Sequence, residues 1–238
     1  MATLVFDIET SALPLENFDE VQQEYLFRDA ERFPEPTARD LKRAEIRRQF
    51  SLWPFTAHVV CIAMLNADTS RGQVLFLADD FDDEAEAGPV EFVSCADEVE
   101  LLTAFWDVAK HYDSIVTFNG RGFDVPFIYL RSAILNVPIS RKDWLGYRFQ
   151  TDPHCDLAEQ LTFYGVSGRE GAARRFNLDF YCKAFRIESP KSHGVTGMDV
   201  NRLLAEGKQR EIAEYCLRDV QATVLLYQIW KERLIGIK

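Results

Sequence analysis

The sequence predicts an α/β protein with a mixed sheet, folded as one domain with an insertion near the amino terminus. Three observations support this fold class. Apolar, β-rich runs at 57–65 and 73–77 flank a turn at 68–72, so together with the run 3–10 they predict an antiparallel meander. A helical pattern at 97–112 leads into a short β-rich run at 114–118, which is typical of a crossover onto a parallel strand. Residues 209–233 read as a long amphipathic helix.

Composition and charge narrow the class of protein. The 238 residues are 47% hydrophobic, enough for one sizeable core. A net charge of −11 argues against a protein that coats nucleic acid, but it leaves room for an enzyme that holds one strand end locally. Five scattered cysteines without C-x-x-C spacing indicate reduced thiols. With no signal sequence and no apolar run of membrane-spanning length, we expect a cytoplasmic protein that does not associate with a membrane.

The first strand, residues 3–10, carries two carboxylates with period-two spacing. Asp7 and Glu9 therefore project from the same face, about 6 to 7 Å apart along the strand. Buried carboxylates need a compensating charge, and no Lys, Arg or His occurs before residue 28. This pattern indicates a metal site, although a hydrated strand end explains the pair as well.

Residues 14–56 interrupt the strands and predict a helical insertion, with a helix at 37–50 for which Thr37 is the N-cap candidate. This helix carries the densest basic cluster of an acidic protein. Two explanations remain open, a solvated face with intrahelical ion pairs and a surface that contacts phosphates. The cluster consists of Arg39, Lys42, Arg43, Arg47 and Arg48.

A second acidic motif follows the predicted strand 114–118. Asp124 lies where a helix begins, with Pro126 in the first helical turn and Gly120 and Gly122 in the turn before it. A helix cap explains Asp124 by itself. In open α/β sheets, however, functional sites gather beyond the carboxyl ends of strands, and Asp124 directly follows such an end.

The final helix carries a third motif, in which Tyr215 and Asp219 lie four residues apart and so share one face beside an apolar stripe. A tyrosine–aspartate hydrogen bond is the structural alternative to a functional pair. Between the second and third motifs, the triplet 154–156 does not predict a zinc site, because consecutive residues of a strand cannot point to one ion. A short helix is predicted at 176–185.

The three motifs in this order, D-x-E, N-G-x-x-F-D-x-P and Y-x-x-x-D, resemble those of the DEDDy 3′–5′ exonucleases of the ribonuclease H-like fold. The resemblance is greatest to stand-alone predicted exonucleases related to the proofreading domain of family B DNA polymerases. It covers most of the chain outside 14–56. It implies a mixed five-stranded sheet, with the first three strands antiparallel and the later strands parallel, and flanking helices.

The resemblance also implies roles for the acids. Asp7 would bridge two divalent cations, Glu9 and Asp124 would complete the leaving-group side, and Asp219 would bind the ion that carries the attacking water. Tyr215 would orient that water. Oxygen ligands suit Mg²⁺ or Mn²⁺.

The same resemblance suggests substrate contacts. Residues after Glu9 would pack against the last base and its sugar on one side of the bound strand, and residues near Asp124 would line the opposite side. The candidates are Thr10, Ser11, Leu13, Asn119 and Phe123. Lys191, in a loop at 189–197, is a candidate phosphate contact, although a plain surface loop explains it equally well.

The sequence thus predicts a two-metal-ion 3′–5′ exonuclease that releases nucleoside monophosphates from single-stranded DNA or frayed 3′ ends. Single-stranded nucleic acid is the expected partner, with DNA favoured, alongside an unknown replication or repair partner. Two alternatives remain. One is an exoribonuclease that trims 3′ ends, because nothing in the sequence shows what would sense a 2′-hydroxyl. The other is a nucleic-acid-binding module without catalysis.

Overall fold

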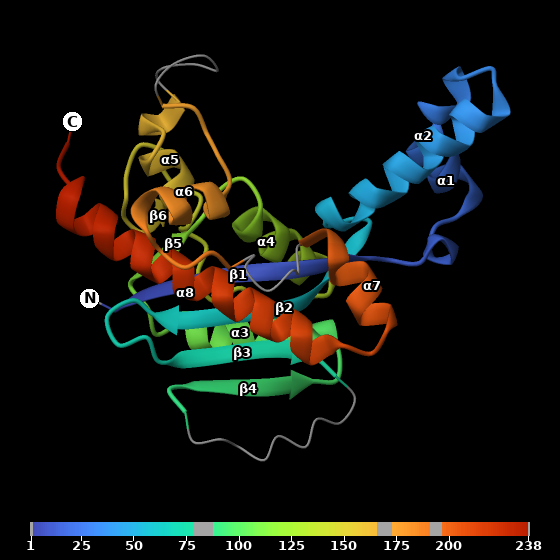
Figure 1. Ribbon diagram of the computed structural model, residues 1–238. Helices are drawn as coiled ribbons and strands as arrows, with labels where there is room; N and C mark the ends of the chain where they lie inside the picture. Colours follow the sequence, from blue (N-terminus) through green and yellow to red (C-terminus); the bar gives the residue numbers. More distant parts are fainter. Residues whose placement is uncertain (1, 79–87, 166–172, 191–196, 238) are drawn as a thin grey trace.

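The computed structural model describes residues 2–78, 88–165, 173–190 and 197–237, and its centre is a mixed sheet (Figure 1). Among these residues the sheet has six strands in the order β4-β3-β2-β1-β5-β6. β1 pairs antiparallel with β2, and β2 pairs antiparallel with β3, while the other pairs are parallel. The strands are β1 (Thr3–Ala12), β2 (Ala57–Asn66), β3 (Gly72–Leu77), β4 (Val90–Cys95), β5 (Ser114–Thr117) and β6 (His154–Asp156).

The predicted mixed α/β fold is confirmed, but the count of five strands is wrong. The strand that sequence analysis did not assign is β4, at the edge of the sheet, where it pairs only with β3. Its residues are only partly buried up to Cys95, so a clear alternation of apolar and polar positions is missing. An edge strand of this kind depends on its neighbour for definition, which a local pattern does not reveal.

Two layers of helices cover the sheet, and their bounds follow most of the predicted segments. α8 (Gln209–Arg233) crosses one face, whereas α3 (Glu98–Ala109) and α4 (Asp124–Ile134) pack on the other (Figure 1). α8 has the predicted bounds, and α3 begins after Asp97, whose carboxylate caps it by accepting from the Glu100 amide. The remaining helices of the body are α5 (Leu157–Gln160), α6 (Leu178–Phe185) and α7 (Val200–Ala205).

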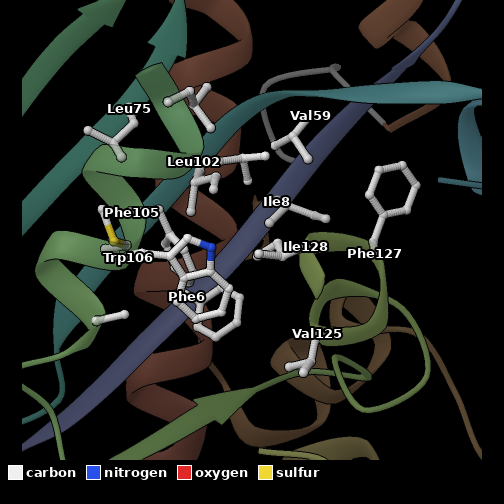
Figure 2. Close-up of a cluster of buried hydrophobic side chains, with 14 of the residues drawn as sticks. Phe6, Ile8, Val59, Leu75, Leu102, Phe105, Trp106, Val125, Phe127 and Ile128 are labelled. Atoms are coloured by element: carbon white, nitrogen blue, oxygen red, sulfur yellow. The ribbon is translucent and has the colours of Figure 1, made fainter. Parts of the chain in front are cut away.

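Alternate residues of β1 belong to two different cores. Leu4, Phe6 and Ile8 pack with α3 and α4, whereas Val5 packs with α8. Figure 2 shows the first of these cores, in which Phe6 and Ile8 lie among side chains of β2, α3 and α4. Because side chains alternate along a strand, Asp7 and Glu9 must share the face of Val5, toward α8.

The insertion between β1 and β2 is helical, as predicted, and extends away from the sheet at the carboxyl end of β1 (Figure 1). It contains α1 (Glu20–Phe27), α2 (Pro36–Gln49) and a 3₁₀ turn, Phe50–Leu52, that leads into β2. It has a small core of its own, made of Phe18, Phe27, Ala30, Ile46 and Phe50. The prediction of Thr37 as N-cap is wrong, because Glu35 is the N-cap and Pro36 takes the first turn, where its lack of an N–H costs nothing.

None of the described helices combines the length and the apolar composition that a membrane crossing requires.

Candidate active site

Asp7 and Glu9 form the base of the site. Both side chains face α8, and ligand atoms of Asp7, Glu9 and the Cys216 thiol all lie within 4.8 Å of one another. Glu9 is buried and Asp7 is partly buried. The pairing of β1 with β2 shifts register between Glu9 and Thr10, a bulge of the kind that often re-aims side chains beside active sites. The predicted shared face is therefore confirmed.

The Asp124 side chain is hydrogen-bonded to the same strand. Its Oδ1 accepts a hydrogen bond of 3.1 Å from the Ile8 amide, which lies between the two acids of β1. The turn before α4 needs Gly120, because a Cβ there would lie 2.5 Å from the Thr117 Oγ1. Asn119 adopts the left-handed conformation in this turn, with φ of 70°. The turn thus brings the start of α4 against β1 and buries Asp124.

Tyr215 and Asp219 approach from α8. They are one helical turn apart, and the Tyr215 hydroxyl donates a hydrogen bond to the Asp219 carboxylate. Tyr215 is buried, with 5% of its surface exposed, so this hydroxyl is held in a fixed position. The hydrogen bond offered as a structural alternative is therefore present, and Tyr215 and Asp219 line the same cavity as Asp7.

The electrostatics of the cluster show that its carboxylates repel one another. Burial, followed by the charges of Asp124, Asp219 and Glu9, raises the pKa of Asp7 well above its ordinary range. Burial, with the neighbouring carboxylates, likewise raises the pKa of Glu9. Burial raises the pKa of Asp124 to about 7, even though the Ile8 amide opposes the change. Burial and the Asp219 charge raise the pKa of the Tyr215 hydroxyl.

This donor set fits divalent cations. No described Lys, Arg or His forms an ion pair with Asp7, Glu9 or Asp124, so within the described residues their charge lacks a cationic partner. Carboxylate oxygens are hard donors that suit Mg²⁺ and Mn²⁺. Bound cations would remove the repulsion that raises these pKa values.

A cavity of about 360 Å³ opens onto the acids from the side of α6. Asp7, Tyr215 and Asp219 form part of its wall, and Arg175 also lines it. Arg175 donates a hydrogen bond to the Asn119 side chain. The other lining residues are Phe118, Asn119, Phe176, Asn177, Leu178, Asp179 and Pro190. The cavity therefore combines acids with one cation and three aromatic rings, a mixture suited to a polar ligand that has a planar group.

The predicted substrate residues occupy different surroundings. Asn119 lines the cavity, whereas Phe123 packs against the core beside Phe127, with ring centroids 5.4 Å apart. Thr10 Oγ1 donates to the Ser51 carbonyl at 2.6 Å. Ser11 Oγ donates to Asn201 Oδ1 at 2.8 Å. Both hydroxyls are thus engaged within the protein.

The structure does not test the predicted substrate contacts of Leu13 and Lys191. Leu13 packs against the small core of the insertion, and its amide donates to the Thr56 carbonyl at 2.8 Å. Lys191 lies outside the described residues. The substrate-binding assignments therefore stay predictions.

The structure adds supporting residues that sequence reasoning did not find. Asp156 accepts hydrogen bonds from the amides of Asn119 and Arg121, both at 2.9 Å, and so holds the turn that carries Asp124. Asn201 fixes the end of β1 through Ser11 and the Ala12 amide. The sequence offers one weak local indication of Arg175, because a basic residue directly followed by an aromatic one is a pattern found in nucleic-acid-binding surfaces. The contacts of Asp156 with Asn119 and Arg121 and those of Asn201 with the end of β1 left no local signal, because these partners are 35 or more residues away.

Comparison with known proteins bears on this arrangement. Residues 54–233 match a family described as predicted 3′–5′ exonucleases related to the exonuclease domain of PolB. The chain belongs to this family. The match begins after β1, so Asp7 and Glu9 precede it, whereas Asp124, Tyr215 and Asp219 lie inside it. The predicted resemblance to PolB-related exonucleases is confirmed.

Relatives of this chain include archaeal DNA polymerases. DNA polymerase 1 of Saccharolobus solfataricus is 30% identical over 138 residues, covering 54% of this chain and 15% of that protein. DNA polymerase 1 of Sulfurisphaera ohwakuensis is 25% identical over 175 residues, which cover 71% of this chain and 19% of that protein. The chain therefore spans less than a fifth of the length of these curated relatives.

A solved structure shares the fold. The family B DNA polymerase from the hyperthermophilic archaeon Pyrobaculum calidifontis superposes with a TM-score of 0.56 at 19% identity. The similarity covers 97% of this chain and 24% of that one. At this level of identity, the similarity shows the fold alone.

Proposed function

We propose that the chain is a two-metal-ion 3′–5′ exonuclease that releases nucleoside monophosphates from single-stranded DNA or frayed 3′ ends. The observation that carries the proposal is the convergence of four acids from three separate elements, Asp7, Glu9, Asp124 and Asp219. Two of them, Asp7 and Asp219, line one cavity together with the fixed hydroxyl of Tyr215. Membership of a family of predicted 3′–5′ exonucleases supports it.

The chain's own residues divide the work as follows. Asp7 would hold both cations, Glu9 and Asp124 would hold the one beside the leaving 3′ oxygen, and Asp219 would hold the other. When bound, such cations lower the pKa of the attacking water and neutralise the charge that develops on the phosphate and the leaving oxygen.

Tyr215 would orient the attacking water. Its hydroxyl donates to Asp219, so an oxygen lone pair is free to accept a proton of the water and align it with the phosphorus. The raised pKa of this hydroxyl keeps it protonated at neutral pH, which suits a role in positioning. Arg175, which lines the same cavity, would meet the negative charge of the phosphate.

DNA is the favoured substrate because the curated relatives are DNA polymerases. An exoribonuclease that trims 3′ ends is the alternative substrate class, and a binding module without catalysis is the alternative of a different kind. The presence of all four acids and Tyr215 favours catalysis over the binding module. A cytoplasmic location and a replication or repair partner stay predictions.

The test is an assay with 5′-labelled single-stranded DNA and RNA of one sequence, each with Mg²⁺, Mn²⁺ or EDTA. We expect stepwise shortening of the DNA from its 3′ end, with release of nucleoside monophosphates, in either metal and none in EDTA. Faster shortening of RNA would favour the exoribonuclease. Intact substrates under every condition would contradict the proposal and favour the binding module.

A further inference from the structure

The base of the insertion carries exposed aromatic residues close to the site. Trp53 is 40% exposed and Phe55 is 64% exposed, and Leu52 beside them is 52% exposed. Trp53 and Phe55 lie between the 3₁₀ turn, Phe50–Leu52, and the start of β2. The family match begins at residue 54, so the insertion before it, including Trp53, lies outside the matched residues.

This segment is held rigidly against both elements that carry the first three acids. On β1, Thr10 Oγ1, next to Glu9, donates to the Ser51 carbonyl at 2.6 Å. On α4, Arg131 Nη1 donates to the Pro54 carbonyl at 3.0 Å. The Arg131 guanidinium is itself fixed by a buried ion pair with Glu98 at 2.6 Å. Trp53 and Phe55, on either side of Pro54, are therefore presented by a fixed backbone and not by a loose loop.

Positive charge lies next to these rings in the chain. Farther out on α2, Arg39 and Arg43 pair with Glu31, and Lys42 pairs with Glu45. The last turn of α2 carries Arg47 and Arg48, which are exposed and form no ion pair with any described carboxylate. The basic cluster thus divides into an outer half with ion pairs and an inner end without them among the described residues. Within this end the Arg47 guanidinium lies over the Phe27 ring, 6.0 Å from its centroid, which leaves Arg48 as the available charge.

Exposed aromatic rings next to unpaired arginines are the two features that bind single strands without sequence preference. The rings stack on bases, and the cations contact phosphates. A protein partner could bind the apolar surface without the arginines. A polynucleotide uses both, because its phosphates complement the charge of the arginines, so charge complementarity favours a polynucleotide. Continuity with Thr10 places this surface beside the strand that carries Asp7 and Glu9.

We infer that Trp53 and Phe55, with Arg48, form an auxiliary single-strand-binding surface that holds nucleotides upstream of the 3′-terminal one. This inference rests on the proposed function for its substrate class. It assigns to the insertion the task of retaining the strand between successive cleavages. Short substrates that end before this surface would gain nothing from it.

The chain offers a direct optical probe. Of its four tryptophans, Trp106, Trp144 and Trp230 are at most 6% exposed, so Trp53 is the one that a ligand in solution can reach. Stacking of a base on Trp53 should quench its fluorescence. We expect oligothymidylate of 12 nucleotides to quench emission in EDTA, where no cleavage occurs. Trp53→Phe should abolish this quenching and leave the KM for the 12-mer within about twofold, because phenylalanine still stacks.

Kinetics provide the second readout. Trp53→Ala and Phe55→Ala should each raise the KM for the 12-mer about tenfold, within the range expected for losing one stacked base, and leave the KM for a dinucleotide unchanged. Tyr25→Ala is the matched control, since Tyr25 is a 64% exposed aromatic of the same insertion that lies in α1, away from Trp53 in the chain. It should change neither value. Arg48→Ala should reduce the slope of log Kd against log salt by about 0.7.

The outcomes separate this inference from the proposed function. One outcome would show that the inference is wrong while the exonuclease proposal stands. In it the 12-mer is degraded but does not quench Trp53 fluorescence, and the KM for the 12-mer is the same in Trp53→Ala, Phe55→Ala and Tyr25→Ala. If no substrate is degraded but the 12-mer still quenches Trp53, the surface binds strands and the catalytic proposal is wrong. Phe55→Ala keeps the test decisive if Trp53→Ala does not fold, because Phe55 is the more exposed ring.

Discussion

The sheet body and the insertion are built in opposite ways. In the body, β1 lies between two large cores and carries the partly buried Asp7 and the buried Glu9, while Asp124 is buried beside it at the start of α4. In the insertion, a five-residue core supports two helices whose charged side chains remain largely in solvent. Burial is therefore concentrated where chemistry requires fixed, perturbed acids. Exposure is concentrated where a surface can meet a partner.

The two regions meet at Arg131. This residue of α4 binds Glu98 of α3 and the Pro54 carbonyl at the base of the insertion. The same Glu98 accepts a hydrogen bond of 2.8 Å from the Val59 amide at the start of β2. A substitution at this junction of Arg131, Glu98 and Pro54 should therefore affect both the body and the insertion, whereas a substitution within one region should affect that region alone.

The largest effect is expected at the centre of the body. Asp7→Asn should lower the turnover rate on the order of 10³- to 10⁴-fold, because cation binding supplies several kcal/mol of transition-state stabilisation. The measurement is the rate at which 5′-labelled single-stranded DNA is shortened from its 3′ end. Asp107→Asn, an exposed acid on α3, is the control and should be unaffected. Wild-type turnover in Asp7→Asn would show that β1 does not bind the metal.

Breaking the junction should have the next largest effect. Arg131→Met leaves the buried Glu98 uncompensated, so we expect the free energy of unfolding to fall by about 3–5 kcal/mol. Urea denaturation measures this change. Adding Glu98→Leu to Arg131→Met should restore part of the loss, since the unpaired charge is then removed. If the double variant is no more stable than Arg131→Met, charge burial is not the cause.

Removing one hydroxyl from the body should have an intermediate effect. Tyr215→Phe keeps the ring buried and loses the hydrogen bond to Asp219, so the turnover rate should fall about 10- to 100-fold. Steady-state kinetics should show a smaller change in KM, because water orientation matters in the transition state more than in substrate binding. A variant that raises KM alone would mean that Tyr215 binds the substrate and does not orient water.

The pH dependence of stability should reveal the buried acids. The folded-state pKa values of Asp7, Glu9 and Asp124 are raised, that of Asp124 to about 7, so from about pH 4 up to these raised values the folded chain binds more protons than the unfolded chain. Their contribution is fully present below pH 4 and is lost as pH rises through the raised values. In EDTA, we expect Tm to fall on the order of 5 °C between pH 5 and pH 8.

Two comparisons test this explanation of the pH dependence. Asp124→Asn should flatten the dependence of Tm on pH in EDTA, because one of the raised carboxyls is gone. Mg²⁺ should raise Tm of the wild-type chain more at pH 8 than at pH 5, where protons compete for the oxygens. Equal gains at both pH values would contradict metal binding by these acids.

The smallest effect is expected on the outside of the insertion. Glu31 pairs with Arg39 and Arg43, and all three side chains are more than a third exposed. Glu31→Gln should lower the free energy of unfolding by less than about 1 kcal/mol and leave nuclease activity unchanged. Urea denaturation and the strand-shortening assay check both statements. A loss above about 2 kcal/mol would show that this pair is part of the insertion's core.

Short-range patterns were enough for several elements. The alternation in β1 predicts that Asp7 and Glu9 share a face, and the stripe of α8 predicts its bounds and the Tyr215–Asp219 pairing. The same reasoning did not find β4, whose strand character depends on β3, and it misplaced the N-cap of α2. It also left open whether the basic cluster of α2 is paired. That depended on Glu31, an acid outside the helix.

The sequence by itself therefore determined the order of the three acidic motifs, the elements that carry them and the family to which the chain belongs. Periodicity and motif spacing are local properties, so they can be read without coordinates. Only the tertiary structure decided that Asp124 binds the Ile8 amide, that Asp156 holds the turn before α4 and that Arg131 joins the insertion to the body. These contacts join residues from 37 to 116 positions apart, and chain separation of that size leaves no periodic trace in the sequence.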